Sequence, residues 1–179
     1  MKNASKIRRL DHKFRFQLLV KWLTENYKPC KAADVGGGKG LLALLLNNSG
    51  WKCEVIDPCQ MSYITKYKNL DINKQIKVDK KECLLIPRRK RHFEAEMAKD
   101  YEILIGLHAH GSNMKIIDAC KMYGKKFVLL PCCVVGEPIE IKPNIDWLKS
   151  LIQYSNEQGF DVGEAELNFK GQNKIIFSR

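Results

Sequence analysis

Residues 31–57 read KAADVGGGKGLLALLLNNSGWKCEVID. A short apolar segment, Lys31–Val35, runs into a glycine-rich turn at residues 36–40. The leucine-rich run Leu41–Leu46 follows, and a second apolar segment, Trp51–Ile56, ends at Asp57. Glycine lets the backbone turn sharply and approach a ligand without a Cβ in the way. This stretch therefore predicts a strand–helix–strand unit that binds a ligand at its glycine turn.

The spacing between the turn and the next acidic residue narrows the class of ligand. Asp57 follows Gly36 by 21 positions, and a carboxylate at that distance can accept hydrogen bonds from ribose hydroxyls. The dinucleotide-binding fingerprint requires a glycine where Leu41 stands, and a Walker-type loop requires Ser or Thr after Lys39, where Gly40 stands. We therefore expect a nucleoside ligand that is bound neither through a dinucleotide fingerprint nor through a Walker-type phosphate loop.

The run Asp34-Val35-Gly36-Gly37-Gly38-Lys39-Gly40 resembles motif I of class I S-adenosylmethionine-dependent methyltransferases. That resemblance implies S-adenosyl-L-methionine as the cofactor. It places Asp34, Gly36, Gly37, Gly38 and Gly40 around the methionine and ribose, and Asp57 on the ribose. Two further cofactor contacts are expected. Asp79 would lie on the adenine side, after the third predicted strand (residues 75–78), and Leu107 would lie at the end of the fourth (residues 101–107).

The rest of the chain alternates between strand and helix patterns. Strands are predicted at residues 75–78, 101–107 and 126–130, a terminal hairpin at 160–169 and 173–178, and helices at 8–27, 61–70, 113–123 and 144–158, with helix also expected from Phe93. The resulting α/β fold is a seven-stranded Rossmann-like methyltransferase sheet, mostly parallel, with a C-terminal antiparallel hairpin and helices on both faces. Residues 1–179 are expected to form one domain that includes the basic helical segment 1–30.

Two motifs follow the predicted fourth and fifth strands, namely Leu107-His108-Ala109-His110-Gly111 and Pro131-Cys132-Cys133. In open parallel sheets ligands lie beyond the carboxyl ends of the strands, so both motifs are expected beside the reactive methyl group. Together they resemble a subgroup of these methyltransferases that includes a tRNA 2′-O-ribose methyltransferase family. The Asn/Asp-Pro-Pro-aromatic signature of amino-methyltransferases is absent after the fourth strand, which argues against methylation of an exocyclic base amine.

Histidine is suited to removing a proton from a hydroxyl group or a ring nitrogen, because it titrates near neutrality. His108 is the first candidate for a catalytic base or substrate-positioning residue, and His110 is the second. The alternative is that one or both histidines only form hydrogen bonds within the turn.

A metal site and a thiolate nucleophile are two other interpretations of the same motifs. His108, His110, Cys132 and Cys133 are the residue types of a zinc site. Successive strand residues point to opposite faces, however, so the two cysteines are expected to diverge and no metal is expected. A nucleophilic Cys59 would follow the second strand, at the ribose end. Cys133, after the fifth strand, is better placed, but no partner cysteine follows the fourth strand. Packing is the expected role of Cys132, Cys133, Cys30, Cys53 and Cys120.

Basic residues form two blocks. The chain has 31 Lys and Arg against 20 Asp and Glu, a formal net charge of +11. Residues 1–30 hold eight basic and two acidic residues, and residues 61–91 hold ten and three. Such blocks on a nearly neutral body are typical of polyanion binders, so RNA is the expected partner. The expected phosphate contacts are Lys6, Arg8, Arg9, Lys13, Arg15, Lys80, Lys81, Arg88, Arg89, Lys90 and Arg91.

The cysteine content and the apolar runs indicate a compartment. Seven cysteines, without any Cys-x-x-Cys pair, favour free thiols in a reducing cytoplasm. Residues 127–135 fall short of the roughly 20 apolar residues that a membrane span needs, and the basic N-terminus leads into no apolar signal region. We therefore expect a cytoplasmic protein without membrane segments.

Three functions remain open from the sequence. The first is an S-adenosylmethionine-dependent methyltransferase that acts on tRNA or rRNA, at a ribose hydroxyl or a base. The second is a methyltransferase of a small molecule or a protein, in which the positive charge is incidental. The third is a non-catalytic nucleic-acid-binding protein with a vestigial cofactor pocket.

Overall fold

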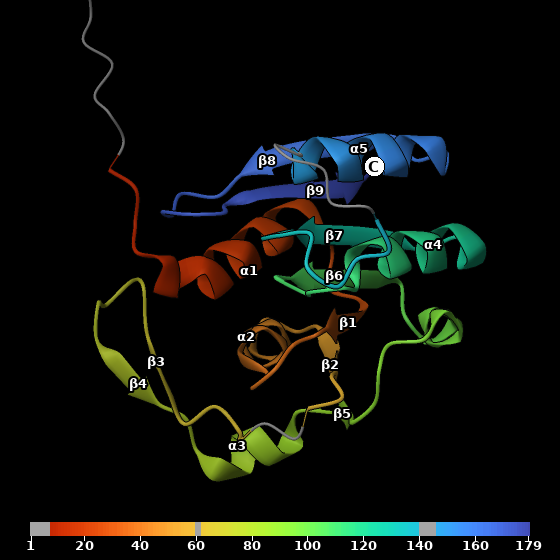
Figure 1. Ribbon diagram of the computed structural model, residues 1–179. Helices are drawn as coiled ribbons and strands as arrows, with labels where there is room; N and C mark the ends of the chain where they lie inside the picture. Colours follow the sequence, from red (N-terminus) through yellow and green to blue (C-terminus); the bar gives the residue numbers. More distant parts are fainter. Residues whose placement is uncertain (1–7, 60–61, 140–145) are drawn as a thin grey trace, which may run out of the picture.

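The computed structural model describes residues 8–59, 62–139 and 146–179 of the chain, and its centre is a seven-stranded sheet in the order β5-β2-β1-β6-β7-β9-β8 (Figure 1). The strands are β1 (Lys31–Val35), β2 (Lys52–Ile56), β5 (Arg88–Arg89), β6 (Ile103–Leu107), β7 (Lys126–Leu130), β8 (Val162–Glu166) and β9 (Lys174–Ser178). The first five run parallel, while β9 is antiparallel to both β7 and β8. The predicted mostly parallel sheet with a terminal hairpin is confirmed.

Helices cover both faces of this sheet. On one face lie α1 (Arg15–Asn26) and α2 (Leu41–Asn48); on the other lie η2 (Ala95–Asp100), α4 (Asn113–Tyr123) and α5 (Trp147–Glu157). Alternate side chains of strand β7 pack into the two cores on opposite faces of the sheet. Val128 and Leu130 pack on the side of α1 and α2, while Phe127 and Leu129 pack on the side of α4 and α5. None of the helices in the described ranges is both long and apolar enough to cross a bilayer.

The region between β2 and β5 differs from the prediction. Residues 61–70 were expected to be helical and residues 75–78 to form the third strand of the main sheet. Instead β3 (Lys66–Lys68) and β4 (Gln75–Lys77) form a separate antiparallel pair, and β5 takes the edge position beside β2. The cause is turn chemistry, because the side chain of Asn69 accepts hydrogen bonds from the amides of Asp71 and Ile72 (3.0 and 3.1 Å).

The short hairpin formed by β3 and β4 is anchored to α1. The side-chain amide of Gln17 donates to the Lys68 carbonyl (2.8 Å) and accepts from the Leu70 amide (2.7 Å). A polar residue in the first turn of α1 therefore holds a segment more than fifty positions away, which no periodicity in the sequence reveals.

Three helix boundaries also differ from the prediction. A 3₁₀ turn, η1 (His12–Phe14), precedes α1, and residues 8–11 before it are not helical, because Leu10 bridges to Phe169 near β8. The helix expected from Phe93 is the 3₁₀ segment η2. The structure also contains a helix that was not predicted, α3 (Lys80–Leu85), with Asp79 as its N-cap. Helix α5 begins at Trp147, and residues 144 and 145 of the predicted helix lie outside the described ranges.

Candidate cofactor cleft and histidine–cysteine cluster

The glycine turn lies between the carboxyl ends of β1 and β2. The Gly36 amide donates to the carbonyl of Ile56 (2.8 Å), and Gly36, Gly38 and Gly40 have left-handed φ angles of 69°, 53° and 83°. The carboxylate of Asp57 accepts from the Gly38 amide (2.9 Å), while the guanidinium of Arg88 donates to the Gly38 carbonyl (2.7 Å). Hydrogen bonds to both the amide and the carbonyl of Gly38 therefore hold the turn.

Asp34 lies directly beneath the turn and is 1% exposed. Its Oδ2 has no hydrogen-bond partner within the described chain, and a Cβ on Gly37 would lie 2.3 Å from that oxygen. Burial raises the pKa of Asp34 to about 7, against the opposing effects of the Ala43 amide and the charge of Arg88. A buried carboxyl group without a partner at a ligand-sized opening is a candidate for binding a polar or cationic ligand group.

Two clefts open on either side of Gly36 and His108. The first, of about 320 Å³, extends over the turn towards α1 and is lined by Arg15, Phe16, Asp34, Gly36, Gly37, Gly38, Lys39, Leu41, Ile64, Leu107 and His108. The second, of about 330 Å³, extends towards β5 and is lined by Val35, Gly36, Ile56, Asp57, Pro58, Cys59, His92, Phe93, His108, Ala109, His110 and Ser112. The glycine turn, Asp57, Leu107 and both candidate histidines therefore meet at one end of the sheet.

His108 lies at the junction of the two clefts, in a backbone conformation that non-glycine residues seldom adopt (φ 54°). Its amide donates to the Leu130 carbonyl (3.0 Å), and its ring stacks on that of His12 at 5.4 Å between centroids. The Nε2 atom is buried without a partner among the described residues. Burial lowers the pKa of His108 to about 4, with a backbone contact from Gln172 opposing it.

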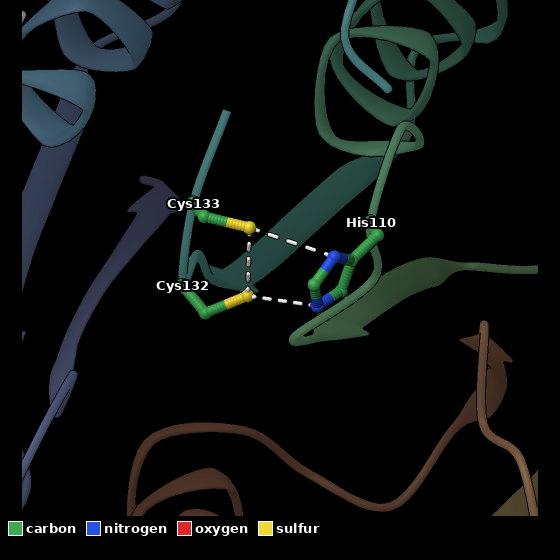
Figure 2. A group of neighbouring side chains, drawn as sticks. All are labelled: His110, Cys132 and Cys133. Carbon is green, nitrogen blue, oxygen red and sulfur yellow. Dashed lines mark hydrogen bonds between the residues drawn. The ribbon is translucent and has the colours of Figure 1, made fainter. Parts of the chain in front are cut away.

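His110 faces the two cysteines that follow β7 (Figure 2). The Sγ of Cys132 lies 3.2 Å from Nε2 of His110 and 3.6 Å from the Sγ of Cys133, which lies 3.5 Å from Nδ1. The prediction that Cys132 and Cys133 point apart is wrong. Strand β7 ends at Leu130, and Pro131 begins an irregular segment in which strand alternation does not apply.

A buried carboxylate fixes this irregular segment against the turn after β6. Glu137 accepts from the amides of Asn113 and Met114 (2.9 and 3.1 Å) at the start of α4, and from the Asn113 side chain (2.7 Å). A Cβ on Gly111 would lie 2.8 Å from the carbonyl oxygen of Gly136, so the two backbones are in direct contact. These contacts position His110 opposite the cysteines.

One expected cofactor contact is displaced. Asp79 caps α3 by accepting from the Lys81 amide (2.6 Å), and the strand before it belongs to the separate hairpin. Asp79 was expected to contact adenine because the strand before it was predicted to be the third strand of the main sheet. That strand, β4, is not part of the main sheet, so the assignment of Asp79 to the cofactor is wrong. His92 and Phe93, which follow β5 and line the second cleft, occupy the corresponding place. The two-residue strand before them carries no sequence pattern that would have identified them.

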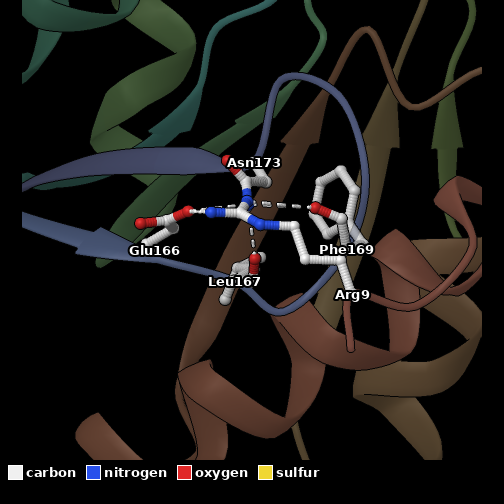
Figure 3. A network of polar contacts seen from close by, with 5 residues as sticks. All are labelled: Arg9, Glu166, Leu167, Phe169 and Asn173. Atoms are coloured by element: carbon white, nitrogen blue, oxygen red, sulfur yellow. Dashed lines mark hydrogen bonds and ion pairs between the residues drawn. The ribbon is translucent and has the colours of Figure 1, made fainter. Parts of the chain in front are cut away.

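Several basic residues expected to contact phosphate have internal partners instead. Arg9 pairs with Glu166 and donates to the Phe169 carbonyl, and Asn173 completes that network (Figure 3). Besides Arg88, which holds the glycine turn, Arg89 pairs with Glu54 (3.1 Å) and Asp100 (2.7 Å).

The other basic residues of the two blocks differ in how exposed they are. Arg15 is half-buried in the first cleft and lies over the Phe16 ring at 4.3 Å. Lys13 is exposed but pairs with Asp11 (3.4 Å), and Lys6 lies outside the described ranges. The remaining members are exposed, namely Arg8, Lys80, Lys81, Lys90 and Arg91.

Solved structures similar to this chain are methyltransferases. The ribosomal protein L11 methylase of Lactobacillus delbrueckii subsp. bulgaricus has 16% sequence identity and a TM-score of 0.56, over 92% of this chain and 76% of its own. The precorrin-6y C5,15-methyltransferase of Geobacter metallireducens GS-15 has 12% identity and a TM-score of 0.53, over 97% and 88% of the two chains.

A third similar structure is an O-methyltransferase family protein of Burkholderia thailandensis, with 11% identity and a TM-score of 0.52 over 91% of this chain and 55% of its own. Neither a protein-family model nor a curated protein sequence matches the chain. At these identities the similarity concerns the fold alone. The chain has the fold of class I S-adenosylmethionine-dependent methyltransferases.

Proposed function

We propose that this protein is an S-adenosylmethionine-dependent methyltransferase. The observation that carries the proposal is the glycine turn above buried Asp34, with the carboxylate of Asp57 at the end of the adjacent strand. In an open parallel sheet this is the place where nucleoside ligands bind. The similarity to solved methyltransferases supports the same cofactor.

The residues at the two clefts fit the chemical groups of that cofactor. Asp57 can accept hydrogen bonds from ribose hydroxyls, in addition to those from the Gly38 and Cys59 amides (2.9 and 2.8 Å). The unpaired Oδ2 of Asp34 is available to the cationic methionine end, and the apolar ring of Phe93 lines the side where adenine would lie. The cofactor supplies an electrophilic methyl group, and the chain supplies its orientation.

His108 is the candidate for handling the acceptor's proton. It lies where the two clefts meet, and its Nε2 has no partner among the described residues. Because burial lowers the pKa of His108 to about 4, its imidazole is neutral at physiological pH and can accept a proton, as a weaker base than a free histidine, from a hydroxyl group or ring nitrogen as the methyl group is transferred. His110 is directed towards the cysteines, so we assign the proton-accepting role to His108 alone.

RNA is the acceptor that the charge distribution favours. Lys90 and Arg91 directly follow β5 and therefore lie at the carboxyl end of the sheet, and Lys90 shares a cleft with Asp57. Arg15 and Lys39 line the first cleft. The motifs at residues 107–111 and 131–133 resemble those of a subgroup that includes a tRNA 2′-O-ribose methyltransferase family, which supports a ribose hydroxyl of tRNA or rRNA. The seven free cysteines support a reducing compartment such as the cytoplasm.

The test is transfer of a labelled methyl group from S-adenosylmethionine into three acceptor fractions: total RNA, protein extract and small metabolites from cells that lack this protein. We expect label in RNA, followed by identification of the methylated nucleoside by mass spectrometry, and no label with the Asp57→Ala variant. Label confined to protein or metabolites would reject RNA as the substrate. Absence of label from all three fractions would reject the enzymatic function.

A further inference from the structure

We propose that His110, Cys132 and Cys133 form a binding site for a thiophilic divalent cation, with Zn²⁺ as the expected occupant. One ligand atom from each of the three residues lies within 4.8 Å of the other two. None of the three residues is assigned to the methyl donor, although His110 lines the second cleft, and the proposal does not depend on the protein being a methyltransferase.

The separation of the two sulfurs is close to that around a tetrahedral zinc ion, and each sulfur lies near a different ring nitrogen of His110. Bonds of about 2.3 Å to sulfur and about 2.0 Å to nitrogen separate two sulfurs by about 3.8 Å, and sulfur from nitrogen by about 3.5 Å. The Sγ atoms of Cys132 and Cys133 are 3.6 Å apart, and the sulfur–nitrogen distances to His110 are 3.2 and 3.5 Å. His110 presents one ring nitrogen to each sulfur, and its exposed ring can turn so that a single nitrogen faces the ion.

The framework that holds the three side chains is rigid. Gly111 and Gly136, on the two segments that carry the ligands, are in backbone contact and have left-handed φ angles of 66° and 78°. The buried Glu137 carboxylate fastens the segment after β7 to the first turn of α4 through two amide hydrogen bonds. Ligands that are already positioned lose little conformational entropy when the ion binds, which favours affinity.

The type of ligand selects the metal. Two thiols and an imidazole favour zinc over the hard cations Mg²⁺ and Ca²⁺, which prefer oxygen. Each thiol gives its proton to the solvent when it ligates the ion as a thiolate. Within the ranges that the structure describes, the group contains no fourth His, Cys, Asp or Glu. Three protein ligands leave the fourth position to water or to a heteroatom of a substrate, as in zinc sites with an open position.

A path for the ion exists. Cys132 and Cys133 line a cleft of about 390 Å³ together with Asp146, Gln172 and Lys174, and His110 lines the neighbouring cofactor-side cleft. The cluster therefore lies between two openings to solvent, and the open coordination position is reachable from at least one of them.

The test uses the full-length protein, stripped of metal and kept reduced with a phosphine, and titrated with Zn²⁺ and separately with Co²⁺. We expect one equivalent of each to bind, and the Co²⁺ form to show thiolate-to-cobalt charge-transfer absorption and the visible bands of tetrahedral cobalt. Cys132→Ser, Cys133→Ser and His110→Asn should each weaken Zn²⁺ binding at least about tenfold, since each removes one ligand. Mg²⁺ should not compete.

Cys30→Ser is the matched control, because Cys30 is a half-buried thiol that precedes β1 at the opposite end of the sheet. This variant should bind zinc like the wild type, and circular dichroism should show that all variants are folded. The proposal is overturned if the reduced wild type binds no Zn²⁺, if Co²⁺ binds without thiolate bands, or if Cys30→Ser loses as much affinity as the Cys132 variant. A protein that binds zinc without transferring methyl groups would leave this site intact and reject only the enzymatic function.

Discussion

Asp34 illustrates how a single residue serves a binding site at a cost in stability. Its carboxyl group is 1% exposed and one of its oxygens has no partner within the described chain. Burying such a group is unfavourable unless it stays protonated or meets a ligand. Residues of this kind persist where function requires them, and here the residue lies against the glycine turn.

The contribution of Asp34 to the free energy of unfolding should therefore fall as pH rises. Burial raises the pKa of Asp34 to about 7 from its ordinary value of 3.8, so between pH 4 and 7 the folded state binds more protons than the unfolded state. The contribution of this group is favourable below pH 4 and is lost as pH rises through 7. Asp34→Asn should remove that part of the slope, measured as the difference in the free energy of unfolding between variant and wild type at several pH values. An unchanged slope would show that Asp34 stays ionised in the folded protein.

Asp57 is the residue whose loss should affect the cofactor most specifically. Asp57→Asn keeps one oxygen for the Gly38 amide but removes the charge and one acceptor, so S-adenosylmethionine should bind about tenfold or more weakly, equivalent to about 1.4 kcal/mol. Calorimetry measures the change, with Asp71→Asn, on the exposed tip of the β3–β4 hairpin, as the control for charge alone. Equal affinities for both variants would contradict the assignment of Asp57 to the ribose.

At the scale of elements, strand patterns were most informative where both faces of a strand are buried. The ranges predicted for β1 and β7 match the structure to the residue, because β1 ends at the glycine turn and β7 ends before Pro131. Strand β5 has two residues and β3 three, too few for any periodicity. Their positions follow from contacts with β2 and α1, which are distant in sequence.

The candidate site was likewise predictable only where its residues belong to one contiguous stretch of the chain. The glycine turn and Asp57 could be identified because one strand–helix–strand unit carries both of them. The cluster of His110 with Cys132 and Cys133 could not, because an irregular backbone after β7 replaces the strand alternation on which the prediction depended. The partners of Arg88 and Glu137 likewise come from separate elements.

The start of α2 allows steric contact to be separated from backbone strain. Gly40 and Gly50 have nearly equal φ angles of 83° and 85°, so alanine at either position should cost about 1–2 kcal/mol from the left-handed conformation alone. A Cβ on Gly40 would also lie 2.5 Å from the Arg88 guanidinium, whereas one on Gly50 meets nothing within 4 Å. Gly40→Ala should therefore lower stability further than Gly50→Ala and also weaken cofactor binding.

Thermal unfolding and calorimetry of these two glycine variants check that expectation. If the two lose the same stability and both retain full affinity for S-adenosylmethionine, the interaction between Arg88 and the glycine turn does not hold the turn in its binding conformation.

At the scale of the whole molecule, the uneven charge is the feature that bears on the substrate. Several arginines of the basic blocks are tied to carboxylates or to the glycine turn, so the residues left for phosphate are fewer than the sequence suggests. Lys90 and Arg91 remain exposed at the carboxyl end of the sheet. That residues 1–179 form one domain, with the basic segment 1–30 as part of it, stays a prediction.

RNA affinity should depend on these two residues and on salt. The double variant Lys90→Glu/Arg91→Glu should weaken RNA binding and reduce the slope of log affinity against log salt by about 1 for every phosphate group that the variant no longer binds. The control Lys28→Glu/Lys121→Glu makes the same change in net charge at exposed positions away from the two cofactor-side clefts. Binding curves at two salt concentrations measure both variants. Equal reductions in affinity would attribute RNA binding to net charge alone.

Calorimetric titration of the purified wild-type protein with S-adenosylmethionine tests the central claim most directly. We expect a single-site heat of binding, together with a rise in the temperature of unfolding when the cofactor is in excess, because a ligand that binds only the folded state stabilises it. Neither heat nor any thermal shift at saturating concentrations would show that the turn between Val35 and Leu41 does not hold a methyl donor.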